Sequence, residues 1–162
     1  MYASTKGKTF TSENQDYVEV LDDKANFSGP IRYNDSKLLV VMLGQQFAKH
    51  FPLNNVTWTE VDPGYCMSSL DQNLPFGVYH FALAMRWLFG RTTELGSRNL
   101  LWASLAGSKE GVDGKGTYIS SCAPLRPHPF LQTEKGKAAE ERIYKQTVTL
   151  FKQVAPEAAS GL

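Results

Sequence analysis

Tyr33 and Lys37 stand four residues apart at the start of an apolar stretch with helical spacing. Residues at positions i and i+4 of a helix lie on one face, one above the other. A lysine ammonium next to a phenol favours the phenolate, so it lowers the tyrosine pKa from its usual value of about 10. Such a tyrosine can exchange a proton with the oxygen of a carbonyl compound or an alcohol. The pair therefore predicts acid–base chemistry, although a surface helix can carry the same spacing without any function.

The helices and strands that we expect around this pair are those of an α/β protein. Apolar periodicity with capping and stopping residues predicts four helices, over residues 35–51, 78–89, 93–106 and 133–154. Runs of β-branched and aromatic residues predict two strands, over residues 55–61 and 116–121. With 162 residues, we expect a single domain: a polar loop segment over 1–30 with room for a short helical turn, a structured part over 31–155, and a tail over 156–162.

The apolar pattern also predicts which faces are buried. The helix over 35–51 has apolar residues on two sides and is expected to be buried on both. In the helix over 93–106, Leu95, Trp102 and Leu105 share the face expected to point inward. The most apolar stretch, 78–89, is shorter than the roughly 20 residues that cross a bilayer, so we expect a soluble helix and no membrane span. The core is expected to take up a set of aromatic residues and one histidine: Trp58, Tyr65, Phe76, Tyr79, His80, Phe81, Trp87 and Trp102.

Charge and cysteine content narrow the choice of partners and compartment. The net charge is +1 and the basic residues are scattered, which gives no sign of binding to nucleic acid or to an anionic membrane. Cys66 and Cys122 are far apart in the sequence and are expected to be free, buried thiols of a cytoplasmic protein. The three histidines are dispersed without ligand spacing, so no metal site is predicted.

Several segments together resemble the C-terminal half of a short-chain dehydrogenase/reductase, in its fungal, retinol-dehydrogenase-like branch. The Tyr33–Lys37 pair is followed by a strand, the turn Asp62-Pro63-Gly64 and the hydroxyl residue Ser68. Two later segments add to the likeness, Arg91-Thr92-Thr93-Glu94-Leu95-Gly96-Ser97-Arg98 and Gly116-Thr117-Tyr118-Ile119-Ser120-Ser121-Cys122. The resemblance covers residues 30 to 155. It implies the C-terminal portion of a Rossmann-like fold, with about two parallel strands and four helices.

The resemblance also assigns roles to individual residues. Tyr33 is the expected general acid, and Lys37 tunes it and binds the nicotinamide ribose. Pro63, Gly64 and Ser68 match the turn that contacts the nicotinamide carboxamide. The implied cofactor is NAD(P), and the implied substrate is a small apolar alcohol or carbonyl compound. In the family the helix over 35–51 also packs on a partner subunit, which implies a homodimer.

One half of the family's pattern is missing from the sequence. The T-G-x-x-x-G-x-G turn of the N-terminal β-α-β unit, which holds the cofactor pyrophosphate, has no counterpart. Gly111, Gly114 and Gly116 have the wrong spacing and precede a strand. The family's catalytic serine lies upstream of the tyrosine at the end of a strand, and none of the serines Ser4, Ser12 and Ser28 fits that position. We therefore do not expect the chain alone to transfer hydride, and it could function without a cofactor.

Three functions remain open at this point. The first is the C-terminal portion of an NAD(P)-dependent oxidoreductase, completed by an N-terminal half. The second is a cofactor-free isomerase or cyclase of small apolar molecules that uses Tyr33 for proton transfer. The third is a non-catalytic partner that pairs with a full-length homologue. The strand over 55–61 is expected to have an open edge, which favours pairing with another chain.

Overall fold

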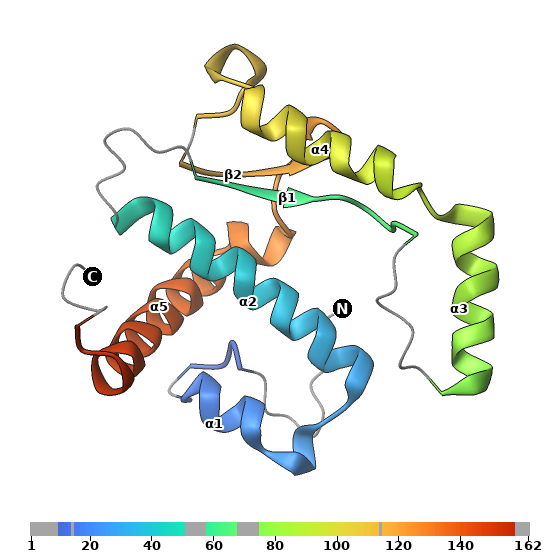
Figure 1. Cartoon of the computed structure of the whole chain (residues 1–162). Coiled ribbons are helices and arrows are strands. Elements are labelled where there is room, and N and C mark those ends of the chain that lie inside the picture. Colours follow the sequence, from blue (N-terminus) through green and yellow to red (C-terminus); the bar gives the residue numbers. More distant parts are fainter. Residues whose placement is uncertain (1–9, 14, 51–57, 68–74, 114, 158–162) are drawn as a thin grey trace. The chain divides into compact units, whose positions relative to one another are not determined.

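The computed structural model describes residues 10–13, 15–50, 58–67, 75–113 and 115–157. The helices are α1 (Tyr17–Asp22), α2 (Gly29–His50), α3 (Phe76–Phe89), α4 (Thr93–Leu105) and α5 (Glu134–Val154). The strands are β1 (Trp58–Asp62), β2 (Lys115–Ser120) and β3 (Ala123–Pro124), and short 3-10 helices cover Lys24–Asn26, Ser108–Glu110 and Pro129–Gln132. The chain divides into two compact units, residues 1–58 with 126–162 and residues 59–125 (Figure 1).

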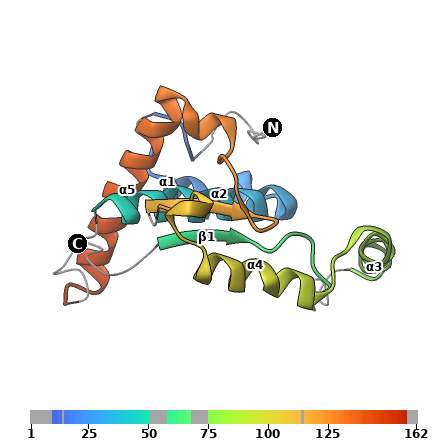
Figure 2. The same ribbon diagram turned by 90° about the horizontal axis from the view of Figure 1, so that it is seen from above.

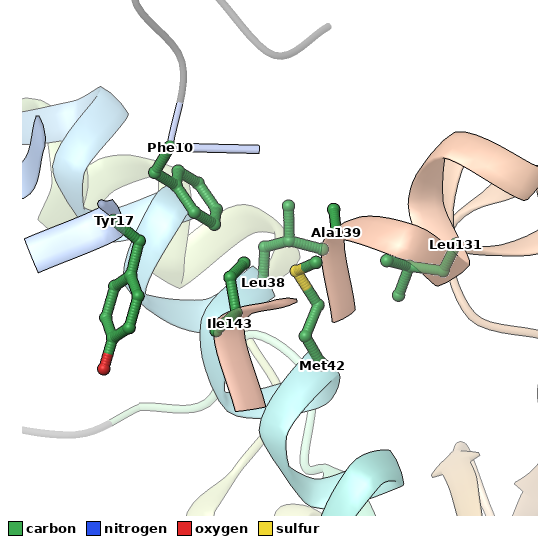
Figure 3. Close-up of a cluster of buried hydrophobic side chains, with 7 residues drawn as sticks. All are labelled: Phe10, Tyr17, Leu38, Met42, Leu131, Ala139 and Ile143. Atoms are coloured by element: carbon green, nitrogen blue, oxygen red, sulfur yellow. The ribbon is translucent and has the colours of Figure 1, made fainter. Parts of the chain in front are cut away.

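The helical unit is built around α2 and α5, which cross each other in both views of the ribbon (Figures 1 and 2). Its core collects side chains from the turn at residue 10, from α1, α2 and α5, and from the 3-10 helix before α5 (Figure 3): Phe10, Tyr17, Leu38, Met42, Leu131, Ala139 and Ile143. Phe10 and Tyr17 come from the segment expected to be a loop, and the Tyr17 hydroxyl lies 2.8 Å from Oγ1 of Thr147. The N-terminal segment therefore contributes a helix and two core residues.

Helix α2 begins at Gly29, six residues before the predicted start. Pro30 is compatible with this start, since the first turn of a helix has no intrahelical use for its N–H groups. Leu38 and Met42 are buried in the core, whereas Val40 is 62% exposed. The early start places Tyr33 and Lys37 within one regular helix.

The second unit contains a small sheet in the order β1-β2-β3. Strands β1 and β2 run in the same direction (Figure 1), and β2 and β3 form an antiparallel hairpin in which Ser120 pairs with Ala123. The predicted α/β class is confirmed, with one helix and one short strand more than expected. Ser121 and Cys122, between β2 and β3, both have left-handed backbone conformations, with φ of 55° and 56°.

Helix α4 is buried mainly through residues outside the apolar face noted in the sequence. Gly96, Asn99 and Ala103 are buried, and Trp102, expected in the core, is half-buried and packs against the core of this unit. Leu95 and Leu105 are 44% and 78% exposed. Residues three and four apart share a helix face, so small residues let α4 lie close to β2, which it contacts. The leucine-rich face remains without a partner among the residues that the structure describes.

Helix α3 has no buried residue, which corrects the expectation that its aromatic residues and His80 belong to the core. Phe76, Phe81 and Trp87 are 83%, 69% and 78% exposed. His80 is also exposed, and its Nδ1 lies 2.7 Å from the Phe76 carbonyl oxygen. Outside α3, Tyr65 and Trp58 are 46% and 36% exposed. Across the described part of the chain, no helix has both the length and the apolar character needed to cross a membrane.

Candidate functional site

Tyr33 and Lys37 lie on the same exposed face of α2, one turn apart. Their neighbours Leu38 and Met42 are buried in the core of the helical unit and fix the rotation of the helix. The Tyr33 side chain is 50% exposed. The Lys37 ammonium lies over its ring, 5.5 Å from the ring centroid, which is a cation–π geometry. The fold therefore brings this predicted pair together in a position that a ligand can reach.

The turn of helix around the pair has polar contacts of its own. The Ser36 hydroxyl donates a hydrogen bond of 2.7 Å to the Tyr33 carbonyl oxygen. Burial raises the pKa of Asp35, and the positive charge of Arg32 partly opposes the rise. The arrangement offers a phenol hydroxyl that can donate a proton, with the Lys37 cation one helical turn away over its ring.

The turn after β1 carries the next predicted residues, in the other unit. The Gly64 N–H donates a hydrogen bond of 2.8 Å to Oδ1 of Asp62, which closes a tight turn around Pro63. Gly64 has φ of 79°, a conformation that favours glycine. Ser68 lies outside the described residues. Because ligands of α/β sheets bind beyond the carboxyl ends of parallel strands, the turn at Pro63 and Gly64 is in a position suited to binding.

Arg91 connects this turn to the end of β2. Its main chain forms a parallel bridge with Cys66, with hydrogen bonds of 2.8 Å from Arg91 N to Tyr65 O and from Met67 N to Arg91 O. Its guanidinium lies against Gly64, where a Cβ atom would be 3.3 Å from Nη1. Nη2 donates a hydrogen bond of 2.9 Å to the hydroxyl of Ser121. One arginine thus contacts both turns.

Asn99 makes a second connection between the end of β1 and the turn at Ser121 and Cys122. It is 1% exposed on α4, and its Nδ2 donates a hydrogen bond of 3.2 Å to the Asp62 carbonyl oxygen. Its Oδ1 accepts from the Cys122 N–H at 2.5 Å and from the Cys122 thiol at 3.1 Å. We refer to these residues as the carboxyl-end cluster: Asp62, Pro63, Gly64, Arg91, Asn99, Ser121 and Cys122.

Arg91 and Asn99 were not among the site residues predicted from the sequence. Asn99 is a polar residue three positions after Gly96, so the two share a helix face, and this spacing could have indicated its role. Arg91 stands between the end of α3 and the capping residue Thr92, where nothing in the pattern shows which way its side chain points. Both roles depend on contacts with residues at least 23 positions away.

The two cysteines lie close to the carboxyl-end cluster or belong to it. Cys66 and Cys122 are free and half-buried. The Cys66 thiol donates to the Pro63 carbonyl oxygen at 3.3 Å and packs where a Cβ of Gly96 would stand. Within the described ranges, no group of three His, Cys, Asp or Glu residues is arranged to hold a metal ion.

The chain is similar to several curated fungal proteins. It is 29% identical over 149 residues to a short chain dehydrogenase of Arthrobotrys oligospora, covering 92% of this chain and 45% of that protein. A short chain dehydrogenase/reductase of a Cryptosporiopsis species is 34% identical over 134 residues (80% and 38%). A short-chain dehydrogenase of Penicillium roqueforti is 30% identical over 154 residues (89% and 39%).

The chain therefore spans about two fifths of the length of these relatives, consistent with the C-terminal half of such proteins. No model of a protein family matches the chain. No solved structure matches it either.

Proposed function

Because the chain belongs to the short-chain dehydrogenase/reductase family, we propose that it supplies the acid–base half of an NAD(P)-dependent oxidoreductase. The substrate class is a small apolar alcohol or carbonyl compound. The dinucleotide-binding β-α-β half comes from another part of the same protein or from a partner chain. The paired Tyr33 and Lys37 on the exposed face of α2 are the observation that carries this proposal.

Residues of each unit, taken separately, suit one part of a nicotinamide cofactor. Lys37 offers ammonium donors to a ribose, and the turn at Pro63 and Gly64 offers main-chain groups to a carboxamide. The sequence contains no glycine-rich turn between a strand and a helix to hold the pyrophosphate. We therefore assign this chain the nicotinamide end, and assign the diphosphate to the complementary half.

In the proposed reaction Tyr33 handles the proton. When a carbonyl compound is reduced, the Tyr33 O–H donates its proton to the carbonyl oxygen, and in the reverse direction the phenolate accepts the alcohol proton. Lys37 stabilises the phenolate through its positive charge. The nicotinamide, when bound, supplies or accepts the hydride. The chain's own share of the work is to hold and move this proton.

A fluorescence titration with NADPH and NADH tests the proposal, using the chain alone and the chain mixed with the N-terminal part of a full-length relative. We expect cofactor binding and carbonyl reduction in the mixture, and binding at least tenfold weaker by the chain alone. Tyr33→Phe should lower kcat about 100-fold or more, the usual contribution of a general acid. Tyr144→Phe removes a hydroxyl from a buried ring stacked on His50 and serves as the matched control.

Two results would contradict the proposal. Turnover of a small apolar compound without nicotinamide, abolished by Tyr33→Phe, would instead support the cofactor-free isomerase or cyclase. A mixture that binds cofactor and reduces substrate equally well with wild-type chain and with Tyr33→Phe would assign this chain a non-catalytic pairing role.

A further inference from the structure

The carboxyl ends of β1 and β2 are joined by side-chain contacts in addition to the pairing of the strands in the sheet. Asn99 bonds to the Asp62 carbonyl and to the main-chain N–H of Cys122. Arg91 lies against Gly64 and bonds to Ser121. Two turns separated by more than 50 residues are thereby held as one structure.

The second of these turns needs outside support. A two-residue hairpin turn with φ above zero at both positions favours Asn, Asp and Gly. Here the two positions are Ser121 and Cys122. Both have a Cβ atom, so the left-handed conformation of their backbones costs energy. Asn99 accepts from the Cys122 N–H and Arg91 holds the Ser121 hydroxyl, so both supporting contacts come from outside the hairpin.

Arg91, like Asn99, contacts both turns with a single side chain. Its main chain is fixed by the bridge to Cys66, so the guanidinium has a defined origin. Gly64 leaves the room that the guanidinium fills, since a Cβ there would lie 3.3 Å from Nη1 and 3.4 Å from Cζ. The Arg91 guanidinium therefore packs on the first turn while it bonds to Ser121 in the second.

We infer that Arg91 is a positioning residue, which locks the Pro63–Gly64 turn to the Ser121–Cys122 turn and so fixes the main-chain groups that face a ligand. Its importance for the reaction rests on the proposed function, in which the first turn contacts the nicotinamide. Arg91 acts through the two turns and is not itself assigned a contact with substrate. The locking itself is a property of this chain, whether or not a cofactor binds.

Amide hydrogen exchange of the isolated chain tests the locking directly. We expect Arg91→Met and Ser121→Ala each to accelerate exchange at Gly64 and Cys122 at least fivefold. Arg98→Met is the matched control, because Arg98 is exposed on α4 and bonds only to Glu94 among the described residues. It should leave both amides unchanged. Ser121→Ala decides the question if Arg91→Met does not fold, and unchanged exchange at both amides in Ser121→Ala would overturn the inference.

Steady-state kinetics test the consequence for the reaction. They use this chain mixed with the N-terminal part of a full-length relative. With Arg91→Met we expect the KM for the cofactor to rise about tenfold while kcat changes less than twofold, whereas Arg98→Met changes neither. Faster exchange with an unchanged cofactor KM would overturn the positioning role. If the wild-type mixture binds no nicotinamide cofactor, the proposed function fails, and the exchange rates still decide whether Arg91 locks the two turns.

Discussion

At the scale of single residues, Glu140 places a carboxylate between α2 and α5 with only 2% of its side chain exposed. Its Oε2 accepts a hydrogen bond of 3.1 Å from Gln46 and lies 3.7 Å from the Lys49 ammonium. Its Oε1 has no hydrogen-bond partner among the described residues. Burial raises the pKa of Glu140, and the contacts with Gln46 and Lys49 partly oppose the rise.

This raised pKa predicts how stability depends on pH. The folded chain binds the Glu140 proton more tightly than the unfolded chain, so stability is lost as pH rises through the folded-state pKa. Glu140→Gln removes this loss. We expect it to raise the free energy of unfolding at pH 8 by about 1–3 kcal/mol, the usual cost of an unsatisfied buried polar group. Below the unfolded-state pKa of a glutamate the two proteins should converge, as measured by urea unfolding across pH 4 to 8.

Glu141→Gln is the matched control at the next position. Glu141 is exposed, and its hydrogen bond of 2.6 Å from Lys145 lowers its pKa. Its contribution therefore has the opposite sign and is lost as pH falls through its folded-state pKa. A Glu140→Gln protein less stable than wild type at pH 8 would show that the ion pair with Lys49 outweighs the burial.

At the scale of elements, the contact between α5 and the preceding 3-10 helix depends on Gly136. A Cβ at this position would lie 2.1 Å from the Phe130 carbonyl oxygen and 2.9 Å from the Cα of Leu131. Both are backbone atoms, so a larger side chain cannot be accommodated by a change of rotamer. The same turn carries the cap of α5, in which the Gly136 N–H donates to Oγ1 of Thr133 at 3.1 Å.

We expect Gly136→Ala to lower the free energy of unfolding by about 1–3 kcal/mol, the range for overpacked sites. Gly29→Ala is the control in the same unit, because a Cβ at Gly29 meets no atom within 4 Å. That change should be neutral or stabilise by less than about 1 kcal/mol. Chemical unfolding of the two variants checks the difference, and equal stabilities would show that the 3-10 helix moves aside.

At the scale of the whole molecule, the apolar surface of α3 and α4 is large for a chain that folds alone. Seven large apolar residues of α3 are at least 46% exposed: Phe76, Val78, Phe81, Leu83, Trp87, Leu88 and Phe89. Helix α4 adds exposed leucines at 95, 100, 101 and 105. Monomeric proteins rarely expose contiguous apolar patches beyond a few hundred Å². The same surface would be available to a complementary half in the proposed enzyme.

We therefore expect the isolated chain to bind an apolar dye such as ANS and to self-associate at micromolar concentration. Replacing Phe81 and Leu88, two turns apart on α3, by glutamine should raise the concentration needed for self-association several-fold. Val40→Gln removes an exposed apolar side chain from α2 and should have little effect. Light scattering with size exclusion measures the change, and a wild-type chain that stays monomeric without dye binding would contradict the expectation.

The candidate site was only partly predictable from the sequence. Tyr33 and Lys37 were found because their relationship is local, four residues along one helix. Pro63 and Gly64 were singled out through the family resemblance, which rests here on a local motif, a Pro-Gly turn directly after a strand. Arg91 and Asn99 were missed, because their partners are distant in sequence and a side chain's direction across such distances has no local signature.

The sequence by itself determined the α/β class, the approximate bounds of α3, α4 and α5 and the family, because these depend on periodicity, capping chemistry and motif spacing within short segments. The tertiary structure decided which faces are buried. Leucines and aromatics look like core residues in any pattern, but burial needs a partner surface, and in the described part of the chain no residue of α3 is buried. It also decided that the small residues of α4, and not its leucines, meet the sheet, since close backbone approach is set by space in three dimensions.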